Sequence, residues 1–229
     1  MMNQQPLCVL TVVVAALVSL AVPGFANTPD SQGLVPRVTV GQVLQYDETD
    51  RLSGAVKHAH HKVLTFRIIN ASDSALTFQR VVAGKPPQTV TVDFSRPTPD
   101  EGSANFFFPR GFVDGAPAEF VAGASWHTRI REESSLGQPG TAQFEVVSLD
   151  RTSGRLTIRG SLKGEGDSTD TAPGDTEPSK FHTTTSRTVT VVLINGIIDT
   201  YTVTGDDKQS ANGSTPIAVH VELAYRRVK

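Results

Sequence analysis

Histidines are the residues of this sequence best suited to metal chemistry, and three of its six lie close together at positions 58, 60 and 61. His58 and His60 are separated by one residue, so on a strand their side chains would share one face, about 7 Å apart. Two imidazoles at that spacing could begin a zinc or copper site, which needs a third or fourth ligand. The candidates for that ligand are His127, His182 and His220. The alternative interpretation is an exposed basic loop, because a lysine flanks the histidines on each side.

Two further groups of residues could be read as catalytic, and their spacing argues against both readings. The segment from Gly123 to His127 resembles the turn that carries the nucleophile of a serine hydrolase, but His127 replaces its second glycine. Ser125 also falls on the polar face of an alternating segment rather than on a strand-to-helix turn. Glu132 and Glu133 are adjacent, so on a strand they would point to opposite faces and could not flank one glycosidic bond. The sequence therefore predicts a protein that is not an enzyme.

Apolar and polar residues alternate with a period of two along most of the chain after position 36. The pattern is clearest in residues 155–162 and 217–226, and it recurs in residues 89–94 and 125–131. Such alternation places one set of side chains on each face of a β-strand, so that each strand buries one face and exposes the other. No window of helical length shows helical spacing without an interrupting glycine or proline. The sequence therefore predicts an all-β protein.

Turn signals between the alternating segments predict how the strands are joined. Asn195-Gly196 separates residues 187–194 from residues 197–204 and is typical of a tight hairpin, because that turn needs positive φ angles at both residues. Residues 70–73 and 150–154 separate two further pairs of strands. We expect about ten or eleven strands, mostly joined to their sequence neighbours in an antiparallel meander, since parallel strands would need helical crossovers.

Two stretches of the chain resemble each other and suggest an internal repeat. A strand-like stretch led by Gly41 can be aligned with one led by Gly123. Each is followed by a predicted hairpin, which begins near Phe66 in the first unit and near Phe144 in the second. Chance similarity between β-sequences is the alternative. A true repeat would produce two similar halves around one core.

Two polar segments carry no such alternation. Residues 163–180 contain five acidic residues together with glycine, serine, threonine and proline, and no aromatic or branched apolar residue. A composition of this kind cannot bury enough surface to order itself, which predicts a disordered loop. A calcium-binding loop is the alternative, but the alternating acids and the closing glutamate of such a loop are absent. Residues 206–214 are predicted to form a second loop of similar character.

The alternation also predicts which side chains share the inner, buried face of the sheet. They are Leu64, Phe66, Trp126, Phe144, Leu156, Ile158, Val219 and Val221. A half-open sheet leaves part of such a face uncovered, and covering roughly a few hundred Å² of it would contribute several kcal/mol. We therefore expect a ligand, a partner chain or a second subunit there. The predicted ligand-binding residues are Leu64, Phe66, Phe107, Phe112, Trp126 and Phe144, and His58 and His60 have the parity that places them at the mouth of a cavity on this face.

The start of the sequence has the pattern of a cleaved secretory signal. Residues 7–22 form an apolar run, and Gly24 and Ala26 supply the small side chains expected before a cleavage site. A membrane anchor is the alternative, but the run is shorter than the roughly 20 apolar residues that are needed to span a bilayer. The sequence therefore predicts an exported protein without a transmembrane segment.

Cleavage after residue 26 would leave a flexible segment at residues 27–36 and a single all-β domain at residues 37–229. The only cysteine, Cys8, lies in the predicted leader, so the mature chain has no disulfide and no thiolate metal site. A formal net charge of −2 argues against nucleic acid as the main partner.

The segment from Phe107 to Trp126, with prolines at positions 109 and 117 and a glycine at 123, resembles a pattern in exported bacterial β-proteins of unknown function. The alternating strands around Phe144 and Leu156 continue the resemblance, which covers residues 36–162. It implies one strongly curved antiparallel sheet, a half-barrel or open barrel similar to the lipoprotein-localisation carriers of the bacterial envelope, with a concave apolar face. It implies no catalytic residue, and the chain lacks the lipid-anchor cysteine common among such proteins.

Together these patterns predict a non-enzymatic binding protein of the periplasm, the cell envelope or the extracellular space. Its apolar concave face would hold a lipid-like ligand or a protein partner, with a homo-oligomer as another way to cover that face. One alternative is a metal-binding protein that uses His58 and His60. The other is a structural or assembly component of the envelope whose sheet edges pair with another chain.

Overall fold

The computed structural model describes residues 37–72, 75–93, 117, 120–130, 137–170 and 179–228. Within these ranges the chain forms ten antiparallel strands and no helix, which confirms the predicted all-β class. The strands are β1 (Val43–Gly54), β2 (His58–Ala71), β3 (Ala75–Val82), β4 (Gln88–Asp93), β5 (Ser125–Ile130), β6 (Gly140–Asp150), β7 (Arg155–Asp170), β8 (Ser179–Ile194), β9 (Ile197–Ala211) and β10 (Ile217–Arg227).

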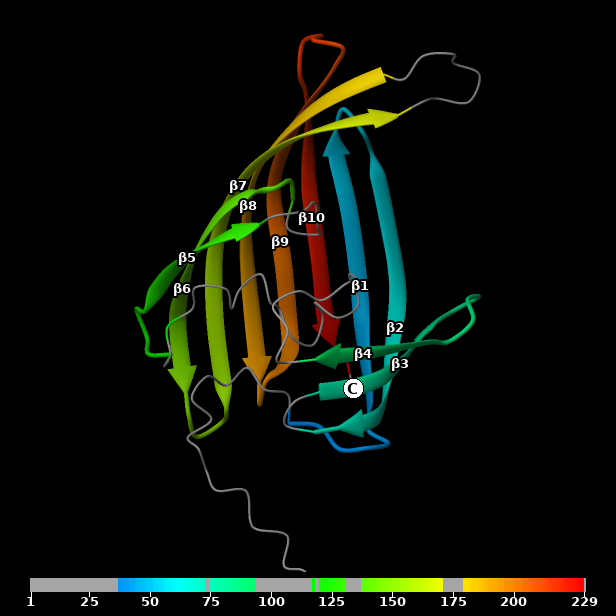
Figure 1. Cartoon of the computed structure of the whole chain (residues 1–229), viewed down its shortest axis with the longest axis vertical. Coiled ribbons are helices and arrows are strands. Elements are labelled where there is room, and N and C mark those ends of the chain that lie inside the picture. Colours follow the sequence, from blue (N-terminus) through cyan, green and yellow to red (C-terminus); the bar gives the residue numbers. More distant parts are fainter. Residues whose placement is uncertain are drawn as a thin grey trace, which may run out of the picture.

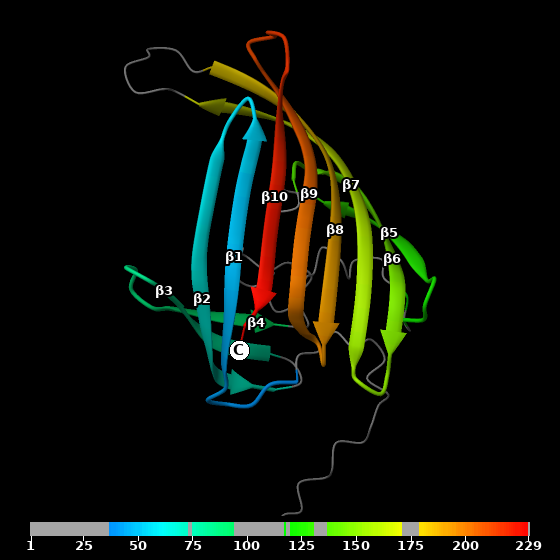
Figure 2. The ribbon, with the colours of Figure 1, turned by 180° about the vertical axis from the view of Figure 1, so that it is seen from behind.

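All ten strands belong to one open sheet with the order β4-β3-β2-β1-β10-β9-β8-β7-β6-β5. Two meanders, β1 to β4 and β5 to β10, are therefore joined where the first strand pairs with the last. The sheet is strongly curved: its two ends, β3–β4 and β5, turn toward the viewer in Figure 1 and away from the viewer in Figure 2. This is the predicted half-barrel.

Side chains of alternating parity fill the inner side of the half-barrel. Phe78 of β3 belongs to the same buried cluster as Val146 of β6, which lies almost at the other end of the sheet. The two can share a core only across the hollow of the curve. Most of the residues predicted for this face are buried there, namely Leu64, Phe66, Trp126, Phe144, Leu156, Ile158 and Val221, and Val219 shares the face but is only partly buried.

The hairpin between β8 and β9 forms as the sequence predicts. Asn195 and Gly196 have φ angles of 52° and 73°, the left-handed values that a two-residue turn of this kind requires. Asparagine tolerates this region better than most residues, and glycine has no Cβ to clash. The turn thus fixes the register of β8 and β9, two long paired strands, from the lower end of the sheet (Figure 1).

The predicted internal repeat is present in the backbone. Before β1, the N–H of Gly41 donates to the carbonyl oxygen of Ile68 at 2.8 Å, and the N–H of Ile68 donates back to Gln42 at 2.9 Å. Before β5, Gly123 and Val146 make the same reciprocal pair, with the N–H of Val146 donating to Ala124; both distances are 2.8 Å.

The two units also share side-chain positions. Leu44 lies opposite Phe66 in the first unit, as Trp126 lies opposite Phe144 in the second. An irregularity of register follows at the same point in each unit, after Ile68 in β2 and after Val146 in β6. The β1–β4 meander and the β5–β8 meander are therefore two versions of one four-stranded unit, with β9 and β10 between them in the sheet.

The prediction of a loop over residues 163–180 is wrong for most of its length. β7 continues to Asp170 and β8 already begins at Ser179, so only residues 171–178 of this segment lie outside the described residues. The prediction for 206–214 is wrong in the same way, because β9 continues to Ala211. In both places the backbone of β8 supplies hydrogen-bonding partners on its two sides, which holds polar strands together without burying their side chains.

Candidate functional site

The inner face of the half-barrel has two parts that differ in exposure. Its lower part in Figure 1 is the buried apolar core. Its upper part, toward the hairpin between β1 and β2, contains an open cavity of about 480 Å³. The cavity is lined by Glu48, Asp50, Leu52, Val56, Thr183, Arg187, Asp207, Gln209, Val219, Val221, Leu223 and Tyr225.

The strand β10 forms the apolar floor of this cavity. Its inward positions carry Val219, Val221, Leu223 and Tyr225, one after another along the strand. The neighbouring strands β1 and β9 supply more polar walls, because their inward-facing residues beside this part of β10 are mostly polar. In register, Asp50 of β1 lies opposite Leu223.

The second wall comes from β8 and β9 and contains a charged pair. Arg187 donates from Nε and Nη2 to the two carboxylate oxygens of Asp207, at 3.1 and 2.5 Å. Both side chains are largely buried, with 10% and 19% of their surface exposed. A bidentate pair with little exposure holds both groups in one geometry, so this wall is rigid and carries little net charge.

The wall on the side of β1 and β2 contains a second pair. The ammonium of Lys62 lies 2.6 Å from the buried carboxylate of Glu48. Burial of a carboxylate is unfavourable without a partner, and Lys62 supplies that partner. The carboxylate of Asp50, two residues further along β1, makes no ion pair with any residue in the described part of the chain.

Tyr225 closes the lower end of the cavity. Its ring packs against the ring of Tyr201, with centroids 5.6 Å apart. Burial raises the pKa of the Tyr225 hydroxyl, the negative charges of Glu48 and Asp50 raise it further, and the positive charge of Arg80 lowers it. Tyr225 therefore remains protonated at neutral pH.

The predicted ligand-binding residues lie below this cavity rather than around it. Leu64, Phe66, Trp126 and Phe144 are each at most 5% exposed and belong to the core. The rings of Phe66 and Trp126 contact other aromatic rings of the chain, including those of Phe78 and Phe120. Phe107 and Phe112 lie outside the described residues. Four of the predicted ligand-binding residues therefore share the inner face with the cavity but lie in its buried part.

His58 and His60 do share one face of β2, as predicted, and their nearly parallel rings have centroids 6.3 Å apart. Both are exposed, and in register they lie opposite Leu52 and Asp50 at the rim of the cavity. In the described ranges, however, no three histidine, cysteine, aspartate or glutamate side chains are close enough to hold a metal ion.

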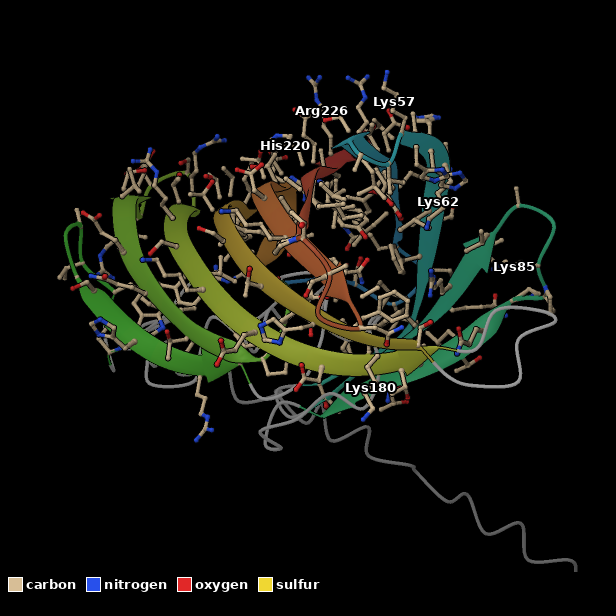
Figure 3. All side chains as sticks on the ribbon, turned by 90° about the horizontal axis from the view of Figure 1, so that it is seen from above. Lys57, Lys62, Lys85, Lys180, His220 and Arg226 are labelled. Atoms are coloured by element: carbon tan, nitrogen blue, oxygen red, sulfur yellow. The ribbon has the colours of Figure 1, made fainter. Side chains whose placement is uncertain are left out.

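The three histidines predicted as further ligands do not converge with this pair. Two of them belong to carboxylate pairs on the outer face of the sheet: His182 Nδ1 lies 2.8 Å from Asp167, and His220 Nδ1 lies 2.8 Å from Asp206. His127 is exposed on β5, on the outer side of the alternation. Figure 3 shows His220 on the back of the sheet, away from its hollow.

His220 stands in an arrangement that resembles a catalytic triad. Its Nδ1 faces Asp206, and its Nε2 lies 3.4 Å from the hydroxyl of Thr204. A nucleophile of this kind also needs backbone N–H groups that point at the reacting oxygen. Here β9 and β10 are central strands, whose N–H groups are committed to the pairing with neighbouring strands. Glu222 also approaches the same Nε2, at 3.7 Å. The arrangement therefore lacks the surroundings of a catalytic site.

A second hollow, of about 670 Å³, lies over β6 to β9. Its lining has no large apolar side chain, and its charges balance, with two lysines at positions 163 and 208 against Glu165 and Asp206. It has no apolar floor that could bind part of a ligand. The cavity over β10 is therefore the better candidate for a binding site.

Sequence reasoning missed the polar residues of that cavity, although a signal was present. Glu48 and Asp50 have the same parity as the buried Leu44 and Tyr46, so the alternation itself places two carboxylates on the inner face. Arg187 and Asp207 could not be found in this way, because their pairing depends on the register between β8 and β9.

No protein family matches the sequence, and no curated protein is significantly similar to it. Among the described residues, no helix has the length and apolar character that crossing a membrane requires.

Proposed function

We propose that this protein is a non-enzymatic binding protein that holds a small amphipathic ligand in the cavity over β10. The observation that carries the proposal is the lining of that cavity, which combines an apolar floor with two polar walls inside a curved sheet. Its volume of about 480 Å³ falls in the range of small-molecule sites.

The location follows from what the chain already buries. The lower part of the inner face is covered in the folded protein, so a ligand is not needed there to remove apolar surface from water. In the upper part, Leu52 and Leu223 are only partly buried and Val56 is 44% exposed. A ligand that covered about 200 Å² of this floor would gain roughly 5 kcal/mol before the costs of binding are subtracted.

The polar walls argue for an amphipathic ligand over a purely apolar one. Arg187, Asp207 and Gln209 offer hydrogen-bonding groups within the same cavity as the apolar floor. A purely apolar ligand would leave those groups desolvated and imperfectly paired, which costs free energy. A ligand with an apolar body and a polar end would satisfy both parts of the lining.

Substitution of Leu52 by tryptophan tests the site directly. Leu52→Trp fills the cavity from the β1 wall, whereas Ser53→Trp adds the same ring to the exposed outer position beside it. We expect wild type and Ser53→Trp to bind decyl amphiphiles in calorimetry and to retain small molecules in native mass spectra. We expect Leu52→Trp to lose that binding while its thermal unfolding remains cooperative.

Equal binding by Leu52→Trp and wild type would exclude this cavity as the site. Absence of binding by the wild type, with every amphiphile tested, would contradict the proposed function as a whole.

We also propose that the protein is exported, on the strength of the apolar leader and the small residues before position 27. The amino terminus of the mature protein would then be Asn27. The relation to lipoprotein-localisation carriers and the role as an envelope assembly component remain predictions from the sequence.

A further inference from the structure

We infer that the ligand of this cavity is an amphipathic cation and that Asp50 binds its positive group. The inference rests on the proposed function and specifies the chemical class of its ligand. It starts from the charges that line the cavity, three carboxylates and one guanidinium.

Two of the three carboxylates are already neutralised within the protein. Asp207 forms the bidentate pair with Arg187, and Glu48 is paired with Lys62. Asp50 remains, half-buried and without an ion pair in the described ranges. Asp50 is therefore the carboxylate of this lining whose charge no ion pair offsets in the described part of the chain.

The position of Asp50 suits a ligand with an apolar body. Leu52 is the next residue of β1 on the same face and lines the same wall. Across the pair of strands, Asp50 lies opposite Leu223 of the floor. A charged group bound at Asp50 would thus leave an attached hydrocarbon chain to lie along β10. Such a group would exchange its own hydration for a charge-assisted hydrogen bond.

Other groups near Asp50 do not remove this preference. His60 and His58 of β2 lie on the same face, at the rim, but both are exposed and neither makes an ion pair with Asp50. Burial is the main cause of the raised pKa of the Tyr225 hydroxyl at the floor; Glu48 and Asp50 raise this pKa further, whereas the guanidinium of Arg80 on β3 lowers it. An anionic group placed at Asp50 would be repelled by the carboxylate of that residue.

The test compares three probes with the same decyl chain in calorimetry: decylammonium, decanoate and uncharged decanol, each below the concentration at which it aggregates. We expect the wild type to bind decylammonium most tightly. We expect Asp50→Asn to weaken that binding about two- to fivefold, which is typical of a partly exposed ion pair. The affinity of decanol should not change.

Asp47→Asn is the matched control, because Asp47 lies on the outer face of the same strand, where it faces His61. It removes the same charge without touching the cavity. Raising the salt concentration should weaken the binding of decylammonium to the wild type, and should have much less effect in Asp50→Asn.

Decanoate binding as tight as decylammonium binding would overturn the inference while leaving the proposed function intact. Equal losses in Asp50→Asn and Asp47→Asn would overturn it as well, since the effect would then come from net charge alone. If no decyl probe binds, the proposed function itself fails.

Discussion

Gly41 and Gly123 occupy the same position in the two repeated units, with φ angles of 87° and 86°. Each donates its N–H at 2.8 Å to the carbonyl of the residue at which the following hairpin becomes irregular. The residue three positions earlier packs on the core in both units, Val38 in the first and Phe120 in the second. The glycine is therefore the joint that leads the chain from the core into the first strand of each unit.

Substitution of either glycine by alanine should destabilise the fold through the backbone alone. No atom lies within 4 Å of the place where a Cβ would stand at Gly41 or at Gly123, so no clash contributes. Alanine in the left-handed region costs about 1 kcal/mol. We expect Gly41→Ala and Gly123→Ala to lower the free energy of unfolding in urea by that amount each, and their double variant to lose the sum.

Asparagine variants at the same positions are the control, because asparagine tolerates positive φ better than alanine does. They should lose less stability than the alanine variants. A loss of several kcal/mol in either alanine variant would mean that these turns make contacts beyond their backbone hydrogen bonds.

Periodicity and turn chemistry were sufficient to predict most of this architecture. Alternation is a local property, so it identified the inner face at Phe66 and Phe144 and the hairpin at Asn195. The repeat was visible because the two glycines and the phenylalanines keep the same order in both units. The curvature of the sheet was expected from the resemblance to half-barrel proteins and not from the alternation.

Composition gave a wrong prediction where strand pairing, and not the burial of side chains, orders the chain. Residues 163–170 bury little, yet they pair with β8 over their whole length. β6 begins at Gly140, opposite Gly164, so the last residues of β7 have no pairing with β6. The acidic side chains of this part of β7 discourage pairing with another chain. The open part of the inner face was also not predictable, because it depends on how far β3 and β4 fold over the sheet (Figure 1).

A second prediction on stability concerns Gly160 and the packing of the inner face. It lies opposite Phe144, and a methyl group in its place would lie 2.3 Å from a carbon of the Phe144 ring and 2.9 Å from Val189. Overpacking of this kind costs about 1–3 kcal/mol. We expect Gly160→Ala to lower the free energy of unfolding by that amount, as measured by urea denaturation.

A smaller side chain at position 144 should relieve this clash. The double variant Gly160→Ala, Phe144→Leu should therefore lose less stability than the sum of the two single variants. Strict additivity would show that the two side chains are not coupled, contrary to their positions in the sheet.

Tyr46 links the stability of the core to alkaline pH. Its hydroxyl donates to the carbonyl oxygen of Ile198 at 2.8 Å, and burial raises its pKa above the ordinary value of 10.0. The folded protein thus keeps this proton at pH values where the unfolded chain has lost it. The corresponding stability is fully present below pH 10 and is lost as the pH rises above it. We expect the free energy of unfolding to fall between pH 9 and pH 11.

The variant Tyr46→Phe separates this titration from the general effect of alkali. It should be less stable than the wild type at pH 8, by about 1–3 kcal/mol, because the carbonyl of Ile198 loses its buried donor. Between pH 9 and pH 11, however, it should lose less stability than the wild type does. Parallel stability curves for the two proteins over that range would show that the Tyr46 hydroxyl titrates equally in the folded and unfolded chains, against its burial in the core.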